Sequence, residues 1–326
     1  MSEWLVGFPD AWAPEVQAAM RAEAPEGFSV VFFDPAVPGH VDEIIGTSDY
    51  LVTGMFQVTR DVLEAAKKVR LVQRWGAGTD QVDLDTACRL GVKVAITAGA
   101  NAHVVAEHAV LLMLAVQRQL PIADRGIRHG EWGPINEGIR AKAQHLAGKT
   151  VGIVGFGHIG RGVAKRLQGF DVEIVYSDVR RADPSVEAGL GATFLTLDEL
   201  LRTADVVTIH SGGGAGSEHL IDAEGIAKMK PNAVLVNAAR GSIVDELALA
   251  DALREGRIFG AGIDVFPVEP IAADDPLIPL ENTVLTPHTA ASTIDNVSHV
   301  ARHVFSNILA ESQGRHVSPA DEIVWP

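Results

Sequence analysis

The chain has 326 residues, 47% of them hydrophobic, and a formal net charge of −15 at pH 7. This length exceeds the roughly 250–300 residues at which a single hydrophobic core stops growing, so we expect two globular domains. The strong negative charge argues against nucleic acid or an anionic membrane as a binding partner, although local arginines can still hold a small anion.

Cys88 is the only cysteine, which excludes an intramolecular disulfide and favours a reducing compartment. The first residues show no basic segment followed by an apolar stretch, so we expect no signal peptide. The longest apolar region, 104–116, is interrupted by Glu107 and His108 and is too short to cross a bilayer. We therefore expect a cytoplasmic protein that does not enter the membrane.

Short apolar runs alternate with helical patterns in the first hundred residues, which is typical of parallel sheets built from βαβ units. We predict strands at 4–8, 30–33, 50–53, 71–74 and 93–96. A long helix is predicted over 103–119, with Asn101 as a candidate N-cap and Pro121 just beyond its end. Residues 128–146 contain glycines, Trp132 and Pro134, and we predict that they are irregular.

A second alternating series begins at Thr150 and ends in a helix predicted over 293–310. Its strands are predicted at 151–155, 173–177, 206–209, 233–237, 260–263 and 284–286. The pattern predicts an α/β fold with two Rossmann-like, doubly wound parallel sheets. We assign residues 1–99 and 293–326 to a discontinuous, flavodoxin-like domain and residues 100–292 to the other domain.

A glycine motif, Gly155-x-Gly157-x-x-Gly160, lies directly after an apolar strand and before a helix. The first glycine permits a tight turn, the second lets a pyrophosphate approach the backbone, and the third lets helix pack close to strand. The helix N-terminus offers N–H groups to the anion. The alternative is a glycine-rich turn that binds nothing.

Asp178 favours the binding interpretation, because it ends the next strand, eighteen residues after Gly160. A carboxylate at this place accepts hydrogen bonds from the adenosine ribose hydroxyls and repels the extra phosphate of NADP. The sequence therefore predicts an NAD site, with Arg180 and Arg181 close enough to soften the preference for NAD.

Three ionisable residues follow consecutive strands of the second domain: Arg240, Glu269 and His288. The carboxyl ends of parallel strands form one edge of a sheet, where ligands bind. Reduction of a 2-oxo acid needs a cation for the carboxylate, a proton donor active near neutrality, and a carboxylate to orient that donor. Each residue taken alone is as easily a surface ion pair, but the set favours this chemistry.

These motifs resemble the D-2-hydroxyacid dehydrogenase family, which includes phosphoglycerate, D-lactate, formate and glyoxylate/hydroxypyruvate enzymes. The resemblance spans residues 71–307 and rests on segments 76–80, 101–107, 155–160, 237–242, 262–266 and 287–289. It implies hydride transfer between NAD(H) and a small 2-hydroxy or 2-oxo acid, with a D product. It also implies a homodimer formed largely through the NAD-binding domain, residues 100–292, with the other domain binding substrate.

The resemblance also implies roles for individual residues. His288 is the acid/base, Arg240 holds the substrate carboxylate and carbonyl, and Glu269 tunes His288. The implied cofactor-binding set is Gly155, Gly157, His158, Ile159, Gly160, Asp178, His210, Ala238, Arg240, Asp264 and His288, with Asp264 near the nicotinamide carboxamide. The implied substrate-binding set is Trp75, Gly76, Ala77 and Gly78, with Arg240 and His288. No metal is expected, because His299 and His303 have no third ligand.

For four residues the sequence leaves two interpretations of the side chain's role open. Arg74 either binds a second polar group of the substrate or forms a salt bridge with Asp80 or Asp83. Met55 and Phe56 either wall the substrate pocket or belong to the core. Trp132 either reaches a partner's active site or merely packs.

The chain departs from the family after the strand at 206–209, where His210 is followed by Ser211 and glycines 212–214 in place of a Pro-Leu-Thr run. We interpret this segment as a loop that orders when NAD binds. The alternative functions are a formate- or phosphite-type dehydrogenase of the same fold and an NAD-sensing, corepressor-like regulator. The sequence does not identify the acid.

Overall fold

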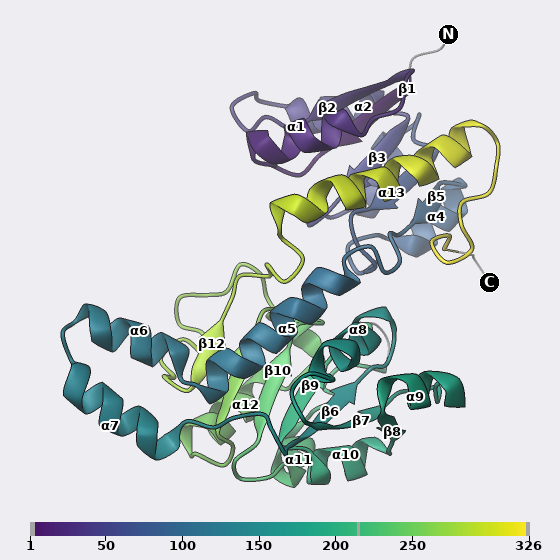
Figure 1. Cartoon of the computed structure of the whole chain (residues 1–326). Helices are drawn as coiled ribbons and strands as arrows, with labels where there is room; N and C mark the ends of the chain where they lie inside the picture. Colours follow the sequence, from purple (N-terminus) through teal and green to yellow (C-terminus); the bar gives the residue numbers. More distant parts are fainter. Residues whose placement is uncertain (1–3, 214–215, 324–326) are drawn as a thin grey trace. The chain divides into compact units, whose positions relative to one another are not determined.

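The computed structural model describes residues 4–213 and 216–323. The chain divides into two compact units, Met1–Asn101 with Ser292–Pro326 (unit 1) and Ala102–Ala291 (unit 2). Each unit contains one sheet of parallel strands with helices on both faces, which confirms the predicted fold class (Figure 1).

The sheet of unit 1 has the order β2-β1-β3-β4-β5. Its strands are β1 (Trp4–Phe8), β2 (Phe28–Phe32), β3 (Tyr50–Thr53), β4 (Leu71–Arg74) and β5 (Lys93–Ala95). After β2 the chain crosses to the other side of β1, so the order reverses between β1 and β3. Ligands of such sheets bind outside the carboxyl ends of the strands at this switch point.

Helices cover both faces of this sheet. α1 (Pro14–Ala22) and α13 (Ile294–Ser312) lie together on one face (Figure 1), where Val304 and Phe305 pack against Val6 and Phe8. The other face carries α2 (His40–Thr47), α3 (Arg60–Ala65) and α4 (Leu84–Leu90).

A buried carboxylate ties α13 to the sheet of unit 1. Glu311 accepts a hydrogen bond from the Tyr50 hydroxyl at 3.0 Å and pairs with Arg70 and Lys93, each at 3.1 Å. Burial alone would raise the pKa of Glu311, but these donors outweigh it and lower the pKa below its ordinary value. The C-terminal helix is therefore an integral part of unit 1.

The sheet of unit 2 has the order β12-β11-β10-β9-β6-β7-β8, with its switch point between β6 and β9. Its strands are β6 (Thr150–Val154), β7 (Glu173–Ser177), β8 (Ala192–Phe194), β9 (Val206–Ile209), β10 (Val234–Asn237), β11 (Gly260–Ile263) and β12 (Thr283–Leu285). β8 was not predicted.

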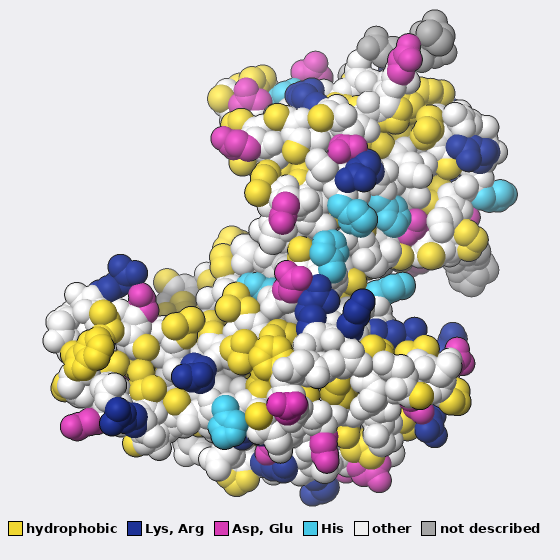
Figure 2. Space-filling model, in the orientation of Figure 1, with side chains coloured by type: hydrophobic (Ala, Val, Ile, Leu, Met, Phe, Trp, Pro, Cys, Tyr) yellow, Lys and Arg dark blue, Asp and Glu magenta, His cyan; other side chains and the backbone are white. Residues whose placement is uncertain are grey.

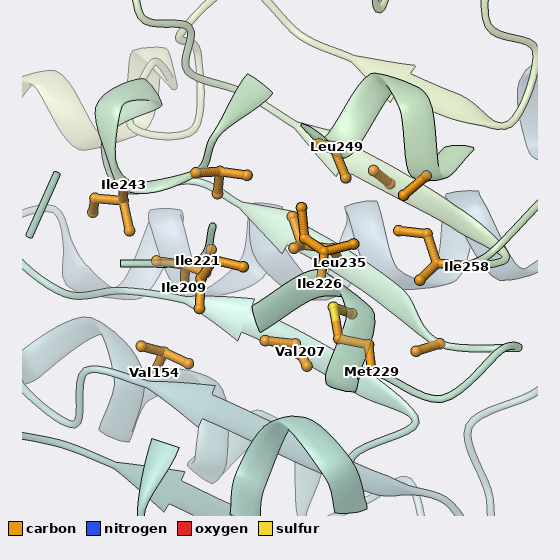
Figure 3. Packing of buried hydrophobic residues seen from close by; sticks show 14 of the residues in the cluster. Val154, Val207, Ile209, Ile221, Ile226, Met229, Leu235, Ile243, Leu249 and Ile258 are labelled. Carbon is orange, nitrogen blue, oxygen red and sulfur yellow. The ribbon is translucent and has the colours of Figure 1, made fainter. Parts of the chain in front are cut away.

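One face of this sheet is covered by α5 (Ala102–Gln117), α8 (His158–Leu167) and α9 (Pro184–Leu190). The opposite face is covered by α10 (Leu197–Thr203), α11 (Ala223–Lys228) and α12 (Glu246–Arg254). Figure 3 shows how Ile226 and Leu249 of these helices point toward Val207 and Leu235 of the strands. This packing fixes the carboxyl ends of the strands, where the candidate site lies.

The expectation that residues 128–146 are irregular is wrong. Residues 132–142 form α7 (Trp132–Lys142), which packs against α6 (Leu120–Arg128). A Cβ at Gly126 would lie 2.2 Å from the side chain of Ile135, so this glycine permits the close approach of the two helices. Pro121 stands in the first turn of α6, where its missing N–H costs nothing.

Candidate active site

The three glycines of the motif have three different surroundings. Gly155 has φ +91°, and a Cβ there would lie 2.4 Å from the backbone nitrogen of Ser211. A Cβ at Gly160 would lie 2.1 Å from the carbonyl oxygen of Gly155, so helix and strand could not approach so closely. At Gly157, the N-cap of α8, no atom lies within 4 Å of the Cβ position. This open space at a helix N-terminus suits a phosphate.

Asp178 lies at the carboxyl end of β7 beside this loop. One carboxylate oxygen accepts the N–H of Phe156 at 2.6 Å, and the other accepts the N–H of Arg180 at 3.0 Å. Arg181 is bound by both carboxylate oxygens of Glu187, at 2.9 and 3.0 Å. Asp178 therefore lies at the end of the strand after the glycine loop, as predicted. The Arg181 guanidinium is bound by the Glu187 carboxylate.

The residues after β9 complete the switch point of unit 2. His210 is buried, its Nε2 lies 2.8 Å from Thr208 Oγ1, and burial lowers its pKa to about 3. Among the described residues, Nδ1 of His210 and Oγ of Ser211 are buried without a hydrogen-bond partner. Such orphaned polar atoms are expected where a ligand supplies the missing partner. Gly214, part of the segment interpreted as a loop that orders with NAD, lies outside the described residues.

His288 and Glu269 form the closest ion pair of the site. Nδ1 of His288 lies 2.7 Å from Oε2 of Glu269, while Oε1 of Glu269 accepts the N–H of Phe266 at 2.9 Å. Burial alone would raise the pKa of Glu269, but the hydrogen bonds from His288 and Phe266 outweigh it and lower the pKa. The His288 side chain remains 34% exposed, so its ring can meet a ligand.

Asp264 fixes the loop that carries His288. Its buried carboxylate accepts hydrogen bonds from the Thr286 hydroxyl (2.6 Å) and from the N–H groups of Thr289 (2.9 Å) and Ala290 (3.0 Å). Its backbone carbonyl accepts the N–H of His288 at 2.7 Å. His288 has φ 52°, a left-handed conformation that few non-glycine residues adopt, and these bonds hold it there.

His108 on α5 adds a group that the sequence analysis did not assign to the site. Its Nε2 lies 3.5 Å from Asp264 Oδ1 and 3.1 Å from Thr286 Oγ1. Burial alone would raise the pKa of Asp264, but hydrogen bonds from His108, Thr286 and the backbone hold it below its ordinary value. The position of Asp264 beside a carboxamide stays a prediction.

Arg240 follows β10 in the neighbouring loop. Its Nη1 donates to the carbonyl of Ala239 at 2.7 Å, and Asn237 donates its side-chain N–H to the carbonyl of Arg240 at 2.9 Å. A Cβ at Gly241 would lie 1.9 Å from the carbonyl carbon of Phe266. This contact brings the Arg240 loop against the loop that leads to Glu269, so the three predicted catalytic residues share one edge of the sheet.

In unit 1, Arg74 ends β4 and is only 5% exposed. Its Nε donates to the carbonyl of Gly78 (3.0 Å), its Nη1 to Thr53 (2.9 Å), and its Nη2 to the carbonyl of Gly54 (2.6 Å) and to Gln81 (2.6 Å). The guanidinium therefore connects the loops that follow β3 and β4. Trp75, Gly76, Ala77 and Gly78 form the second of these loops, and Gly76 has φ +143°.

Asp10, which follows β1, is a second residue that sequence analysis did not single out. Its carboxylate accepts the N–H groups of Gly54 (2.7 Å), Met55 (2.7 Å) and Phe56 (2.8 Å). Met55 itself is 52% exposed, which places its side chain on the surface of unit 1 and not in the core. The sequence could have indicated Asp10 by its position: it follows a predicted strand, at the same edge of the unit 1 sheet as Arg74.

Two remaining expectations concern single side chains. Trp132 is 71% exposed on α7. His303 pairs with Asp321 at 2.7 Å, and in residues 4–213 and 216–323 no three His, Cys, Asp or Glu side chains are grouped as metal ligands. No helix in these same residues is long and apolar enough to cross a membrane.

Comparisons with known proteins identify the family to which the chain is similar. Residues 110–290 match the family model described as D-isomer specific 2-hydroxyacid dehydrogenase, NAD binding domain. A glyoxylate reductase of Korarchaeum cryptofilum is 40% identical over 258 residues, which cover 79% of this chain and 77% of that protein. A D-3-phosphoglycerate dehydrogenase of Mycobacterium bovis is 40% identical over 270 residues, which cover 83% of this chain but 50% of that protein. The solved structure of an NAD-dependent formate dehydrogenase from Staphylococcus aureus matches with a TM-score of 0.85 and 27% identity, covering 98% of this chain and 99% of that one.

Proposed function

This chain belongs to the D-isomer specific 2-hydroxyacid dehydrogenase family, and from that premise we propose that His288, Glu269 and Arg240 carry out its reaction. The protein is an NAD-dependent oxidoreductase that acts on the CH–OH group of 2-hydroxy acids. The 2.7 Å pair between His288 and Glu269 is the main support for these roles, because proton transfer to or from the substrate oxygen needs an acid/base of this kind.

In reduction, His288 gives a proton to the oxygen of the 2-oxo group, and in oxidation it takes the proton back. Glu269 holds Nδ1, which leaves Nε2 free for the substrate and stabilises the protonated ring. Arg240 supplies the positive charge that holds the carboxylate and polarises the carbonyl. The backbone N–H groups of residues 75–79 in unit 1 stay the predicted partners of the substrate carboxylate, and most of unit 2 matches the NAD-binding domain of the family.

The residues of unit 2 fit NAD. The open backbone at Gly157 and the start of α8 suit the pyrophosphate, and the orphaned atoms of His210 and Ser211 lie at the same switch point. Asp178 suits the ribose hydroxyls, and the engagement of Arg181 by Glu187 supports NAD over NADP. Bound NADH supplies the hydride that reduces the 2-oxo carbon.

The test is the initial rate of NADH oxidation over a panel of 2-oxo acids that includes glyoxylate, hydroxypyruvate, pyruvate and phenylpyruvate. We expect turnover, and we expect His288→Ala to lower it about 10²–10⁴-fold while NADH binding persists. An inactive panel with intact NADH binding would favour the corepressor-like alternative.

Formate oxidation is the second candidate, because formate dehydrogenases are among the similar solved structures. That reaction removes a hydride from formate and transfers no hydroxyl proton, so it does not require the Glu269–His288 pair as an acid/base. We therefore expect no NAD reduction with formate. NAD reduction with formate that survives in His288→Ala would establish this alternative.

We also propose a homodimer formed largely through unit 2. Figure 2 shows hydrophobic side chains gathered over α6 and α7, and Leu120, Ile127 and Trp132 are 52%, 50% and 71% exposed. Apolar surface of this kind is typical of protein interfaces. Light scattering coupled to size-exclusion chromatography should give twice the chain mass, and Trp132→Asp should shift the measured mass toward that of the monomer.

We also propose a cytoplasmic location. The free, exposed thiol of Cys88 supports a reducing compartment such as the cytoplasm.

A further inference from the structure

The switch point of unit 1 lies between β1 and β3, where ligands of open parallel sheets bind. Three consecutive N–H groups point to one place after β3, those of Gly54, Met55 and Phe56. Such a run of N–H groups is an anion site. Here the chain fills it, because both carboxylate oxygens of Asp10 are bound to these groups at 2.7–2.8 Å. A phosphate or second carboxylate of a substrate would have to compete with an internal anion.

The nearby guanidinium is also engaged by the chain. Arg74 is 5% exposed and donates four hydrogen bonds to Thr53, Gly54, Gly78 and Gln81. Two of these acceptors are backbone carbonyls, one in each of the loops after β3 and β4. Arg74 therefore holds the two loops in place and does not present its charge to a ligand.

The side chains that remain at this place present mainly apolar surface; the exception is Nε1 of Trp12, which among the described residues is buried without a hydrogen-bond partner. Met55 is 52% exposed on the loop after β3. Trp75 begins the proposed carboxylate loop, and its ring lies 5.4 Å from that of Trp12. The ring of Trp12 also lies beside Gly54, with 3.4 Å between Cζ2 and the Cβ position of that glycine. A substrate whose carboxylate is held by residues 76–79 thus meets aromatic and thioether surface next to it.

We propose that the natural substrate is a 2-oxo acid, or its 2-hydroxy product, whose side chain is apolar and uncharged, such as a branched-chain or aryl 2-oxo acid. This inference rests on the proposed function and names its substrate class. An apolar side chain gains about fourfold in kcat/KM for each methylene buried against this surface. A phosphate gains nothing there, because its two potential partners are bound within the chain and Asp10 repels it.

The test compares kcat/KM for four acids with saturating NADH: glyoxylate, 4-methyl-2-oxopentanoate, phenylpyruvate and 3-phosphohydroxypyruvate. We expect one or both of the apolar acids to exceed glyoxylate at least tenfold and the phosphate-bearing acid at least a hundredfold. A preference for 3-phosphohydroxypyruvate or for glyoxylate overturns the inference and leaves the proposed function standing. No turnover of any acid overturns both.

Variants at Met55 test whether this surface sets the preference. Met55→Ala should lower the ratio of kcat/KM for 4-methyl-2-oxopentanoate to that for glyoxylate by about three- to tenfold. Met55→Arg should raise the relative kcat/KM for 3-phosphohydroxypyruvate at least tenfold. Leu90, 40% exposed at the far end of α4, provides matched controls, Leu90→Ala and Leu90→Arg, which should leave every ratio unchanged. Equal effects at Met55 and Leu90 would refute the assignment.

Discussion

Replacement of Glu269 by Gln should move the pH dependence of catalysis in a direction that the geometry fixes. Reduction needs a protonated His288, and Glu269 stabilises that proton from 2.7 Å. The lowered pKa of Glu269 keeps it ionised through the neutral range. Without the negative charge the protonated ring loses its stabilising partner, so the falling limb for reduction should move to lower pH. Oxidation needs the neutral ring, so its rising limb should move the same way.

The size of the shift follows from the contacts of Glu269. A charge-assisted hydrogen bond contributes about 1.5–3 kcal/mol, and 1.36 kcal/mol corresponds to one pH unit. The Glu269 and His288 side chains are 20% and 34% exposed, which weakens the pair through solvent screening. We therefore expect kcat/KM for reduction at pH 7 to fall about tenfold in Glu269→Gln.

The second oxygen of Glu269 determines how glutamine will be oriented. Phe266 donates its N–H to Oε1, so the glutamine oxygen is needed there and the NH₂ group faces Nδ1 of His288. A donor facing Nδ1 opposes the protonated ring, which adds to the effect of the lost charge.

The assay measures kcat/KM from pH 5 to 10 in both directions for the wild type, Glu269→Gln and Glu255→Gln. Glu255 is a surface glutamate of unit 2 that pairs with Arg257 at 2.8 Å, so its neutralisation controls for a general change of charge. Profiles of Glu269→Gln that coincide with those of the wild type would refute the assigned pair.

Three further predictions test other parts of the structure. Asp178→Ala should shift catalytic efficiency toward NADPH, because a carboxylate facing a phosphate is removed; equal use of both cofactors by the wild type would contradict this. Arg74→Lys should lower kcat/KM for small and large 2-oxo acids by the same factor, since one ammonium cannot replace four fixed hydrogen bonds; a loss confined to polar acids would instead show direct substrate contact. Burial and the neighbouring Asp275 raise the pKa of Glu246 from 4.5 to about 7. The folded protein therefore keeps Glu246 protonated at pH values where the unfolded chain has lost this proton. The stability is highest below the pKa of the unfolded chain and is lost as pH rises through about 7. Glu246→Gln should therefore raise Tm by a few degrees at pH 8 and change it little at pH 5. An equal effect on Tm at both pH values would count against this protonation.

Much of the fold could be predicted because buried parallel strands are continuous apolar runs, as in β3 (Tyr50–Thr53) and β9 (Val206–Ile209). The hairpin of α6 and α7 was missed because α7 has no fully buried residue, so it lacks the apolar periodicity that marks a helix. Gly126 looks like a helix breaker, yet contact with Ile135 requires it. Such a requirement exists only in the folded chain.

The candidate site also has a part that the sequence predicts and a part that only the folded structure reveals. Glycines and an acid at fixed spacing locate the phosphate loop, since Gly155, Gly160 and Asp178 lie within one βαβ unit. Asp10 binds groups 44–46 positions away, and no local pattern predicts such a partner. The orientation of Arg74 likewise depends on two loops that meet only in three dimensions.

The place of α13 in unit 1 has a consequence for the order in which the chain can fold during synthesis. Strands β1–β5 leave the ribosome first, but one face of their sheet is covered by α1 alone until Val304, Phe305 and Ile308 of α13 have been made. At about 5–20 residues per second, residues 102–291 take roughly 10–40 s to appear. Unit 2, contiguous in sequence, can fold in that interval. The nascent N-terminal segment meanwhile lacks the cover that α13 gives Val6 and Phe8, and apolar surface of this kind is what chaperones protect.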